Sequence, residues 1–426
     1  GEALEGLAHH IATVVGPNPA VAKHPAVGAA AAGHHRLGAR GGPPLGDGAP
    51  GADHAVQGLV VLGGGGHLGP GSAAAGTSLA SGHKTAIGRI GMDTSGTVSY
   101  ESIAMKAKSV GMKAGIISSV SIDHATPAAF YAHQPSRGMY FEIGLDLTRS
   151  NIDFFGGGGF KSPEGEYMDQ KVFLPNLAKD SNFRYINSKE EFRTLEPGEG
   201  KVMFVNPELT EGASMYYAID QDEDYITLAE ITRKGISYLD NENGFFMMVE
   251  GGKIDWVSHA NDAAAMVHEV LDFSAAVEEA INFYHAHPDE TLIIITADHE
   301  TGGLALGSRA TGYTLDCSVL SRQTISGENF NTVLQEWRNK GSDQKQDFNS
   351  LMQLIEEYFG LGLEGSAIEL GPEEVKEFDK AFSDFNANTP NEYGNYSHIT
   401  VAATRAISAH AGLGWTSSTH TAIAIP

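Results

Sequence analysis

Short apolar runs that end in acidic or imidazole side chains recur along this chain. Residues 291–299 read Thr-Leu-Ile-Ile-Ile-Thr-Ala-Asp-His, and residues 245–250 read Phe-Phe-Met-Met-Val-Glu. Continuous apolar runs of this length are typical of strands buried on both faces, as in a parallel sheet. Further strand patterns occur at 114–119 and 153–155.

Helical patterns lie between these strand patterns. The spacing of apolar positions predicts a helix that ends near Gly111 and further helices over 141–147, 225–239 and 254–284, the last as one long helix or two. The alternation of strands and helices predicts an α/β fold with a doubly wound, mostly parallel central sheet flanked by helices.

The segment 307–395 has a different pattern. It is polar, contains helical patterns at 351–358 and 373–385, and has few strand signals. We expect a helical insertion, too polar for a large core of its own, that forms a lid over a site or extends a subunit interface. A surface decoration is the alternative. A strand-like stretch at 398–402 follows the insertion.

These patterns divide the chain into four segments. Residues 17–76 are rich in Ala, Gly, Pro and His, and no Phe, Tyr or Trp occurs before Tyr100. We therefore expect a low-complexity N-terminal segment or arm, an α/β core, the insertion, and a return to the core. Their expected bounds are 1–44, 45–306, 307–395 and 396–426.

Five potential metal ligands occur where ligands usually bind in such a sheet. Asp298, His299 and Glu250 end the two strongest strand patterns, and the carboxyl ends of strands line the binding crevice of open α/β sheets. Asp255 and His259 are four residues apart at the start of a predicted helix and therefore share one face of it. Each residue alone has a structural explanation, such as a helix-start carboxylate or a buried histidine. Together they favour a metal site, and zinc accepts both ligand types.

Composition and charge disfavour several classes of function. The formal net charge of −25 argues against nucleic acid and anionic membrane surfaces as partners. No apolar run approaches the roughly 20 residues that span a bilayer. Cys317 is the only cysteine, so the chain has no internal disulfide. Residues 1–30 lack the continuous apolar core of a signal peptide, and we expect a mature form whose export signal has been removed.

A glycine pattern offers a different enzyme class. Gly64, Gly66 and Gly69 follow the apolar stretch 59–62 and match a dinucleotide-binding fingerprint, with Asp93 near the spacing of its acidic residue. The surrounding sequence is glycine-rich throughout, and the proline after Gly69 interrupts the helix that the fingerprint requires. A dinucleotide-binding protein is therefore the weaker alternative.

Two stretches closely resemble the alkaline phosphatase family. They read Val-Glu-Gly-Gly-Lys-Ile-Asp-Trp at 249–256, continued by His-Ala-Asn-Asp at 259–262, and Thr-Ala-Asp-His-Glu-Thr-Gly-Gly at 296–303. Further matches follow in the order that the family requires, and they are Gly46-Asp47-Gly48, Ser72 to Gly82, His124 to Arg137, and Trp415 to Thr421. The resemblance spans residues 45 to 426. It implies hydrolysis of phosphate monoesters to inorganic phosphate by a homodimer that is periplasmic or secreted.

The resemblance also implies a metal centre of two zinc ions and one magnesium ion. The residues implied for the first zinc are Asp255, His259 and His420. Those implied for the second zinc are Asp47, Asp298 and His299. Those implied for the magnesium are Asp47, Thr126 and Glu250, with His124 beside them. Nitrogen-bearing ligand sets suit zinc and all-oxygen sets suit magnesium, so this division is chemically consistent.

Ser72 and Arg137 are the catalytic residues that the resemblance implies. Ser72 would attack phosphorus and form a phosphoserine, and Arg137 would bind two phosphate oxygens. The residue pattern alone fits a helix N-cap at Ser72 and a helix end at Gly82. A helix N-terminus also favours a bound anion, so the two interpretations are compatible.

Three positions depart from the family pattern, and one of them is His124, which stands where some members have Asp and others His. Gly71 precedes the serine where the family usually has Asp, a residue that helps to orient the phosphate-binding arginine. Trp256 follows Asp255 where some members have Lys. The alternatives to a monoesterase are a phosphodiesterase or sulfatase relative of the same superfamily, and an inactive phosphate-binding scaffold.

Overall fold

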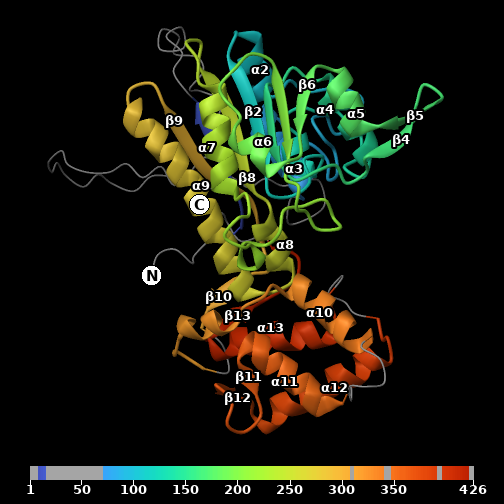
Figure 1. Cartoon of the computed structure of the whole chain (residues 1–426), viewed down its shortest axis with the longest axis vertical. Coiled ribbons are helices and arrows are strands. Elements are labelled where there is room, and N and C mark those ends of the chain that lie inside the picture. Colours follow the sequence, from blue (N-terminus) through green and yellow to red (C-terminus); the bar gives the residue numbers. More distant parts are fainter. Residues whose placement is uncertain (1–7, 16–70, 308–310, 340–346, 391–395, 422–426) are drawn as a thin grey trace, which may run out of the picture.

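The computed structural model describes residues 8–15, 71–307, 311–339, 347–390 and 396–421. An eight-stranded sheet with helices on both faces forms the larger part, and a smaller helical unit lies beyond one end of it (Figure 1). The strands of the sheet, in spatial order, are β14 (His420–Thr421), β9 (Leu292–Thr301), β1 (Ala8–Val15), β8 (Phe245–Gly251), β2 (Lys113–Ser118), β3 (Phe154–Gly157), β7 (Lys201–Val205) and β6 (Phe183–Ile186).

The central strands of this sheet are parallel. β8, β2, β3, β7 and β6 pair in parallel in that order, which confirms the predicted doubly wound, mostly parallel α/β sheet. β1 lies antiparallel between β8 and β9, so that β9 runs in the same direction as β8. The carboxyl ends of β2, β8 and β9 therefore lie at the same edge of the sheet.

Helices cover both faces of the sheet. Side chains alternate between two buried clusters along β2 and β3: Ile116 and Phe155 belong to one cluster, and Ile117 and Phe154 to the other. The helices that contribute to the first cluster are α1 (Ser72–Ser81), α2 (Ile103–Ser109), α3 (Ala125–Ala128), α4 (Tyr140–Arg149) and α5 (Leu174–Asp180). Those that contribute to the second are α6 (Lys189–Arg193), α7 (Leu228–Leu239), α8 (Lys253–His259) and α9 (Ala263–Ala286). A hairpin of β4 (Glu164–Tyr167) and β5 (Gln170–Phe173) precedes α5.

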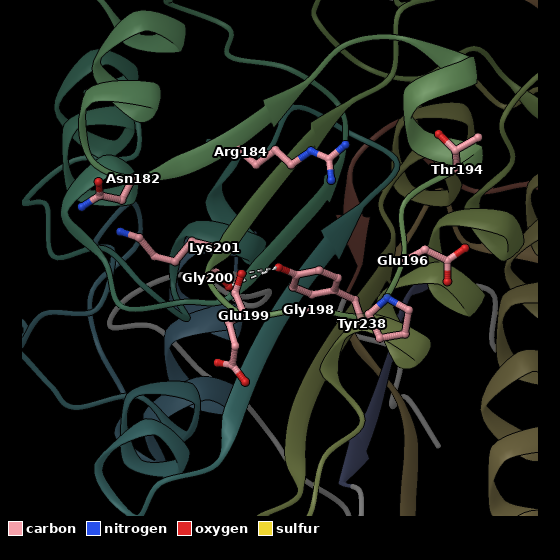
Figure 2. A pocket seen from close by; sticks show the side chains of 10 residues that line it. Asn182, Arg184, Thr194, Glu196, Gly198, Glu199, Gly200, Lys201 and Tyr238 are labelled. Carbon is pink, nitrogen blue, oxygen red and sulfur yellow. Dashed lines mark hydrogen bonds between the residues drawn. The ribbon is translucent and has the colours of Figure 1, made fainter.

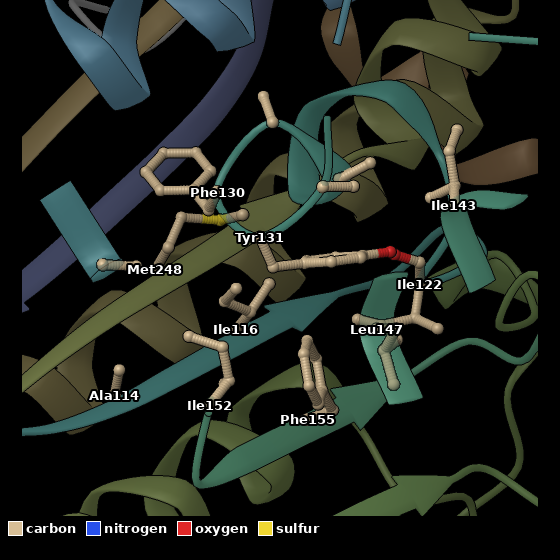
Figure 3. Close-up of a cluster of buried hydrophobic side chains, with 14 of the residues drawn as sticks. Ala114, Ile116, Ile122, Phe130, Tyr131, Ile143, Leu147, Ile152, Phe155 and Met248 are labelled. Atoms are coloured by element: carbon tan, nitrogen blue, oxygen red, sulfur yellow. The ribbon is translucent and has the colours of Figure 1, made fainter. Parts of the chain in front are cut away.

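A buried tyrosine supports the loop after β2. Figure 3 shows Tyr131 among the side chains of the first cluster, where its ring packs edge-on against Phe155 at a centroid distance of 5.3 Å. Its hydroxyl donates to the Ile122 carbonyl at 2.8 Å. Burial raises the pKa of Tyr131 well above its usual value, so the hydroxyl keeps its proton. This contact fixes the segment that carries Thr126.

β9 differs from the strand that the sequence predicts. Leu292, Ile294 and Ile295 are exposed, with Leu292 at 55%, whereas the polar end of the strand is buried. The prediction of a run buried on both faces is therefore wrong. β14 pairs with β9 only at Glu300 and Thr301, so in the described part of the chain the first half of β9 has β1 as its one neighbouring strand.

The predicted helix over 254–284 is two helices. α8 ends at His259 and α9 begins at Ala263. Asn261 between them has a left-handed backbone with φ of 55°, which breaks the helical path. Asp262 then caps α9 by accepting the Ala265 N–H at 3.2 Å.

The helical unit has a hydrophobic core of its own, in contrast to the expectation that 307–395 is too polar for one. Its helices are α10 (Gly327–Asn339), α11 (Phe348–Phe359), α12 (Pro372–Asn386) and α13 (His398–His410), with short strands β10 (Leu304–Leu306), β13 (Leu413–Trp415), β11 (Leu361–Gly362) and β12 (Ile368–Glu369). Phe330, Phe359 and Phe378 are fully buried in the shared core. α10 and α12 are polar overall but amphipathic, so their few large apolar residues gather on one face.

The prediction of a strand at 398–402 is also wrong, because α13 occupies this stretch. Ser397 caps the helix by accepting the Thr400 N–H at 3.0 Å, and Ile399, Ala403 and Ile407 face the core at helical spacing. Among the helices described, none is long and apolar enough to cross a membrane.

Candidate metal centre and active site

Asp255, His259 and His420 form a compact group of potential metal ligands, with ligand atoms that all lie within 4.8 Å of one another. Asp255 and His259 share one face of α8, and β14 brings His420 to them from the C-terminal part of the chain. The Nε2 atoms of His259 and His420 lie 3.3 and 3.4 Å from Asp255 Oδ1. Asp255 is buried, whereas the His259 side chain is 37% exposed, so the group is open to solvent on that side.

Ser72, Asp298 and His299 form an adjoining group, in which all three residues are buried. His299 Nε2 lies 3.5 Å from Asp298 Oδ2 and 3.2 Å from Ser72 Oγ. The imidazole of His299 stacks on that of His420 with a centroid distance of 3.6 Å. The two groups of predicted zinc ligands therefore lie side by side.

The spacing within these groups fits zinc coordination. Ligand atoms about 2.0–2.1 Å from a tetrahedral zinc lie roughly 3.3 Å from one another. The four separations given above range from 3.2 to 3.5 Å. The donor set of carboxylate, imidazole and hydroxyl is also one that zinc accepts, so these residues fit the group that the sequence predicts.

Ser72 lies at the N-terminus of α1, one position later than predicted. Gly71 is the N-cap residue and Ser72 is the first residue of the helix. The prediction that Ser72 is the N-cap residue is therefore wrong. Gly82 ends the helix with φ of 75°, as the sequence predicts. The Ser72 side chain consequently lies at the positive end of a ten-residue helix, where backbone N–H groups favour an anion.

Glu250 and Thr126 are the described residues that the resemblance implies for magnesium; Glu250 lies at the end of β8, and Thr126 lies in α3, which follows β2. Ser118 Oγ donates to Glu250 Oε2 across the two paired strands. Thr126 lies in α3, which packs against α1 at Gly76. Thr126 Oγ1 is buried and has no hydrogen-bond partner among the described residues. A buried hydroxyl oxygen without a hydrogen-bond partner fits an oxygen ligand of the magnesium ion that the resemblance implies.

Arg137 and His124 are in direct contact. Arg137 Nη2 lies 2.9 Å from His124 Nε2, and because a guanidinium can only donate, His124 Nε2 is the acceptor and Nδ1 carries the proton. His124 also packs edge-on against Trp256 of α8, with a centroid distance of 5.5 Å. His124 therefore holds the guanidinium of Arg137 in a chain that has Gly71 instead of the orienting Asp.

Lys253, at the start of α8, connects the site to the helical unit. It is fully buried, and burial lowers its pKa. Its Nζ donates to the Met215 carbonyl at 2.8 Å, lies 3.5 Å from the centre of the Tyr217 ring, and lies 3.5 Å from Glu328 Oε2 of α10. These contacts fix the first turn of the helix that carries Asp255.

Two of the predicted features lie outside the described residues. They are Asp47, predicted as a bridging metal ligand, and the glycines of the dinucleotide fingerprint. Asp93, the acidic residue assigned to that fingerprint, accepts hydrogen bonds from Ser95, Thr97 and Val98 in its own loop. These bonds lower the pKa of Asp93, and they explain the carboxylate as part of a turn.

Three residues around the site were not predicted individually. Thr301 Oγ1 donates to Asp255 Oδ1 at 2.5 Å, Ser118 binds Glu250, and Asn261 joins the end of α8 to the C-terminal segment. Side chains two residues apart on a strand point to the same face, so the sequence alone could have placed Thr301 beside His299. The partners of Ser118 and Asn261 are distant in sequence, so no local pattern identifies them.

A separate cavity of about 440 Å³ lies at the opposite end of the strands. Figure 2 shows Arg184, Lys201 and Tyr238 around it, at the amino ends of β6 and β7 and the end of α7. Glu196 and Glu199 also line it, so its charge is mixed. It contains none of the predicted catalytic or metal-binding residues.

The comparisons with known proteins identify the family. A model of the alkaline phosphatase family matches residues 67–426. The chain belongs to the alkaline phosphatase family. Alkaline phosphatase 4 of Bacillus subtilis (strain 168) is 36% identical over 246 residues, which cover 56% of this chain and 50% of that protein. The chain thus spans about half the length of this relative. The alkaline phosphatase of Escherichia coli (strain K12) is 26% identical over 328 residues, covering 66% of this chain and 68% of that one.

Solved alkaline phosphatases share the fold. The cold-active enzyme from the psychrophile Shewanella sp. has a TM-score of 0.66 and 27% identity, covering 83% of this chain and 77% of that one. A mutant of the TAB5 alkaline phosphatase, with Mg bound in its M3 site, has a TM-score of 0.51 and 30% identity over 59% of this chain and 70% of that one. The alkaline-phosphatase-like fold is therefore confirmed.

Proposed function

We propose that this member of the alkaline phosphatase family hydrolyses phosphate monoesters through a phosphoserine at Ser72. The observation that carries the proposal is the position of Ser72 Oγ. It lies 3.2 Å from His299 Nε2, beside two groups of ligand atoms at zinc-like spacing and at the N-terminus of α1. The proposed nucleophile, the potential metal ligands and a helix N-terminus that favours anions thus lie together at the carboxyl edge of the sheet.

The proposed metal centre has two zinc ions and one magnesium ion. We assign Asp255, His259 and His420 to one zinc, Asp298 and His299 with Asp47 to the other, and Glu250 and Thr126 with Asp47 to magnesium. The Mg bound in the M3 site of the TAB5 mutant supports a magnesium ion in the proposed centre. Bound metal ions of this kind stabilise the negative charge that develops on phosphate and leaving-group oxygens.

The residues of the chain have separate roles in the proposed reaction. Ser72 releases its hydroxyl proton to solvent, and its Oγ forms a bond to phosphorus while the bond from phosphorus to the alcohol oxygen breaks. The alcohol oxygen leaves with that electron pair and takes a proton from solvent. Water then displaces Ser72 from the phosphoserine and releases inorganic phosphate. Arg137 donates two N–H groups to phosphate oxygens, and its contact with His124 restricts the guanidinium to one orientation.

Turnover and elemental analysis together test this proposal. The purified protein should bind zinc and magnesium, hydrolyse a chromogenic phosphate monoester, and hydrolyse the corresponding diester far more slowly. A preference for the diester or for a sulfate ester would favour another branch of the superfamily. Metal binding without turnover of any ester would indicate an inactive phosphate-binding protein.

We also propose that the protein acts as a homodimer in the periplasm or outside the cell. We propose further that the insertion 307–395 contributes to the dimer interface or to the rim of the active-site cleft. The contact between Glu328 and the buried Lys253 supports a link between the insertion and the site. Exposed large side chains occur at Leu306, just before the insertion, and at Tyr313 and Leu315 near its start, and they provide apolar surface for a second copy.

A further inference from the structure

The segment that delivers His420, residues 416–421, is held to the rest of the site by several hydrogen bonds. The Gly302 carbonyl accepts the N–H groups of Thr416 and Ser417, and the Gly302 N–H donates to the Thr419 carbonyl. Gly302 has φ of 85°, and a Cβ there would lie 2.8 Å from the Ser258 carbonyl and closer still to Trp415. Glycine at 302 therefore permits the close approach of Trp415, which precedes this segment, and of the Ser258 carbonyl in α8.

The same segment also contacts the second histidine of the zinc group. His259 Nδ1 lies 2.7 Å from the carbonyl oxygen of Ser418. A carbonyl can only accept, so Nδ1 carries the proton and Nε2 keeps its lone pair. Nε2 is the atom that lies 3.3 Å from Asp255 Oδ1, within the group of potential metal ligands. The Ser418 carbonyl thus selects the tautomer of His259 that can bind a metal ion.

Asn261 fixes the position of this carbonyl relative to His259. Its side chain is 6% exposed, and its amide Nδ2 donates to the Ser258 carbonyl at 3.0 Å and to the Ser417 carbonyl at 2.9 Å. One amide group thus joins the last turn of α8 to the residue before Ser418. Its left-handed backbone, with φ of 55°, directs the side chain toward the segment just after the helix ends.

We propose that Asn261 is a positioning residue of the metal centre: by joining Ser258 to Ser417, it holds the Ser418 carbonyl on His259 Nδ1 and keeps His420 beside Asp255. The inference rests on the proposed function, because it assumes that Asp255, His259 and His420 bind zinc. Partners that orient a ligating histidine typically contribute about 10–100-fold to metal affinity. Loss of the Asn261 amide should leave all three ligands in the chain. The free energy needed to hold them in the metal-binding arrangement should rise, so zinc should bind more weakly.

Asn261→Gly tests the proposal, because glycine adopts the left-handed backbone without strain while the amide is lost. Asn182→Gly is the matched control, since Asn182 also has a positive φ, of 66°, but is exposed at the amino end of β6. Zinc affinity is measured on the metal-free full chain by competition with a chromogenic chelator. Asn261→Gly should weaken one zinc site by about tenfold or more, and the control should match the parent protein. A loss of less than about tenfold overturns the proposal.

Asn261→Asp provides the same test if the glycine variant does not fold. Aspartate tolerates the left-handed backbone but places an acceptor against two carbonyl oxygens. Its added negative charge favours a nearby cation and therefore acts against the expected loss. Zinc affinity below that of the parent supports the proposal, and zinc affinity above that of the parent overturns it. Failure of the proposed function is recognised separately, because the parent protein itself would then bind no zinc.

Discussion

The hydroxyl of Thr301 joins the two groups of proposed zinc ligands. It donates to Asp255 Oδ1 at 2.5 Å and lies 3.3 Å from His299 Nδ1. Hydrogen bonds of this kind fix the orientation of ligating side chains before the metal ion arrives. Asp255 is buried, so without such a donor its carboxylate would be poorly stabilised in the metal-free protein.

Thr301→Val should therefore weaken zinc binding at the Asp255 group. Valine has nearly the same shape but no hydroxyl, and a hydrogen bond to a charged group contributes about 1.5–3 kcal/mol, so the expected loss is on the order of tenfold or more. Thr301→Ser keeps the hydroxyl and serves as the control. Zinc retained after dialysis against a chelator is the measurement, and equal retention by the valine and serine variants would contradict this role.

At the level of helices and strands, the sequence correctly predicts those elements whose structure is determined by a local pattern of apolar residues. The apolar run of β8 and the i,i+4 pair Asp255 and His259 have the predicted structure, because burial on both faces and helical periodicity leave a local signature.

The structure of other segments depends on packing between residues that are distant in the sequence. α13 was expected to be a strand because its first residues are β-branched, yet its apolar positions pack at helical spacing against α10 to α12. His420 reaches its place through an antiparallel pairing with Thr301 that no local pattern encodes.

The buried acidic group on α9 makes stability depend on pH. Burial is the largest of the effects that raise the pKa of Glu269 from 4.5 to about 8; Asp272 and Asp220 act in the same direction, and Lys253 opposes them. A group whose pKa is higher in the folded state contributes stability that is present below the unfolded pKa and is lost as the pH rises through the folded pKa. The protein should therefore lose free energy of unfolding between about pH 4.5 and pH 8 because of Glu269.

Glu269→Gln should reduce this loss. The glutamine carbonyl can still accept the Ala218 N–H, which Glu269 Oε1 accepts at 2.7 Å, and it has no charge to bury. Between pH 6 and pH 9 the parent should lose on the order of 1–3 kcal/mol more unfolding free energy than the variant. Urea unfolding at the two pH values measures the difference. Glu278→Gln, at an exposed position of the same helix, is the control; an identical pH dependence in the parent and Glu269→Gln would contradict the assignment.

On the scale of the whole molecule, the site draws on segments that are far apart in the chain. Asp298 with His299, and Asp255 with His259, could be found from strand ends and helix spacing alone. The resemblance to a family was needed for Ser72, Thr126 and His420, and the fold then brought Ser72 and His420 to His299. The contact between Arg137 and His124 could not be predicted, because it depends on the path of the loop that follows β2.

The proposed homodimer predicts a role for the exposed apolar residues at the start of the insertion. Tyr313→Ser combined with Leu315→Ser removes two exposed apolar side chains without disturbing a core. The double variant should sediment as a monomer at concentrations where the parent is a dimer. Val110→Ser, at a comparably exposed site at the end of α2, should leave the dimer intact. If the double variant and the parent sediment alike, these residues do not form the interface.

The central claim is that Ser72 is the nucleophile, and trapping of the phosphoenzyme tests it most directly. The protein is incubated briefly with a monoester labelled in its phosphate group, quenched in acid, and mapped by peptide sequencing. The account predicts label on Ser72 in the parent protein, no label in Ser72→Ala, and unchanged zinc content in that variant. Label on Thr77, Ser78 or another residue, or turnover without any label and with net inversion at phosphorus, would contradict it.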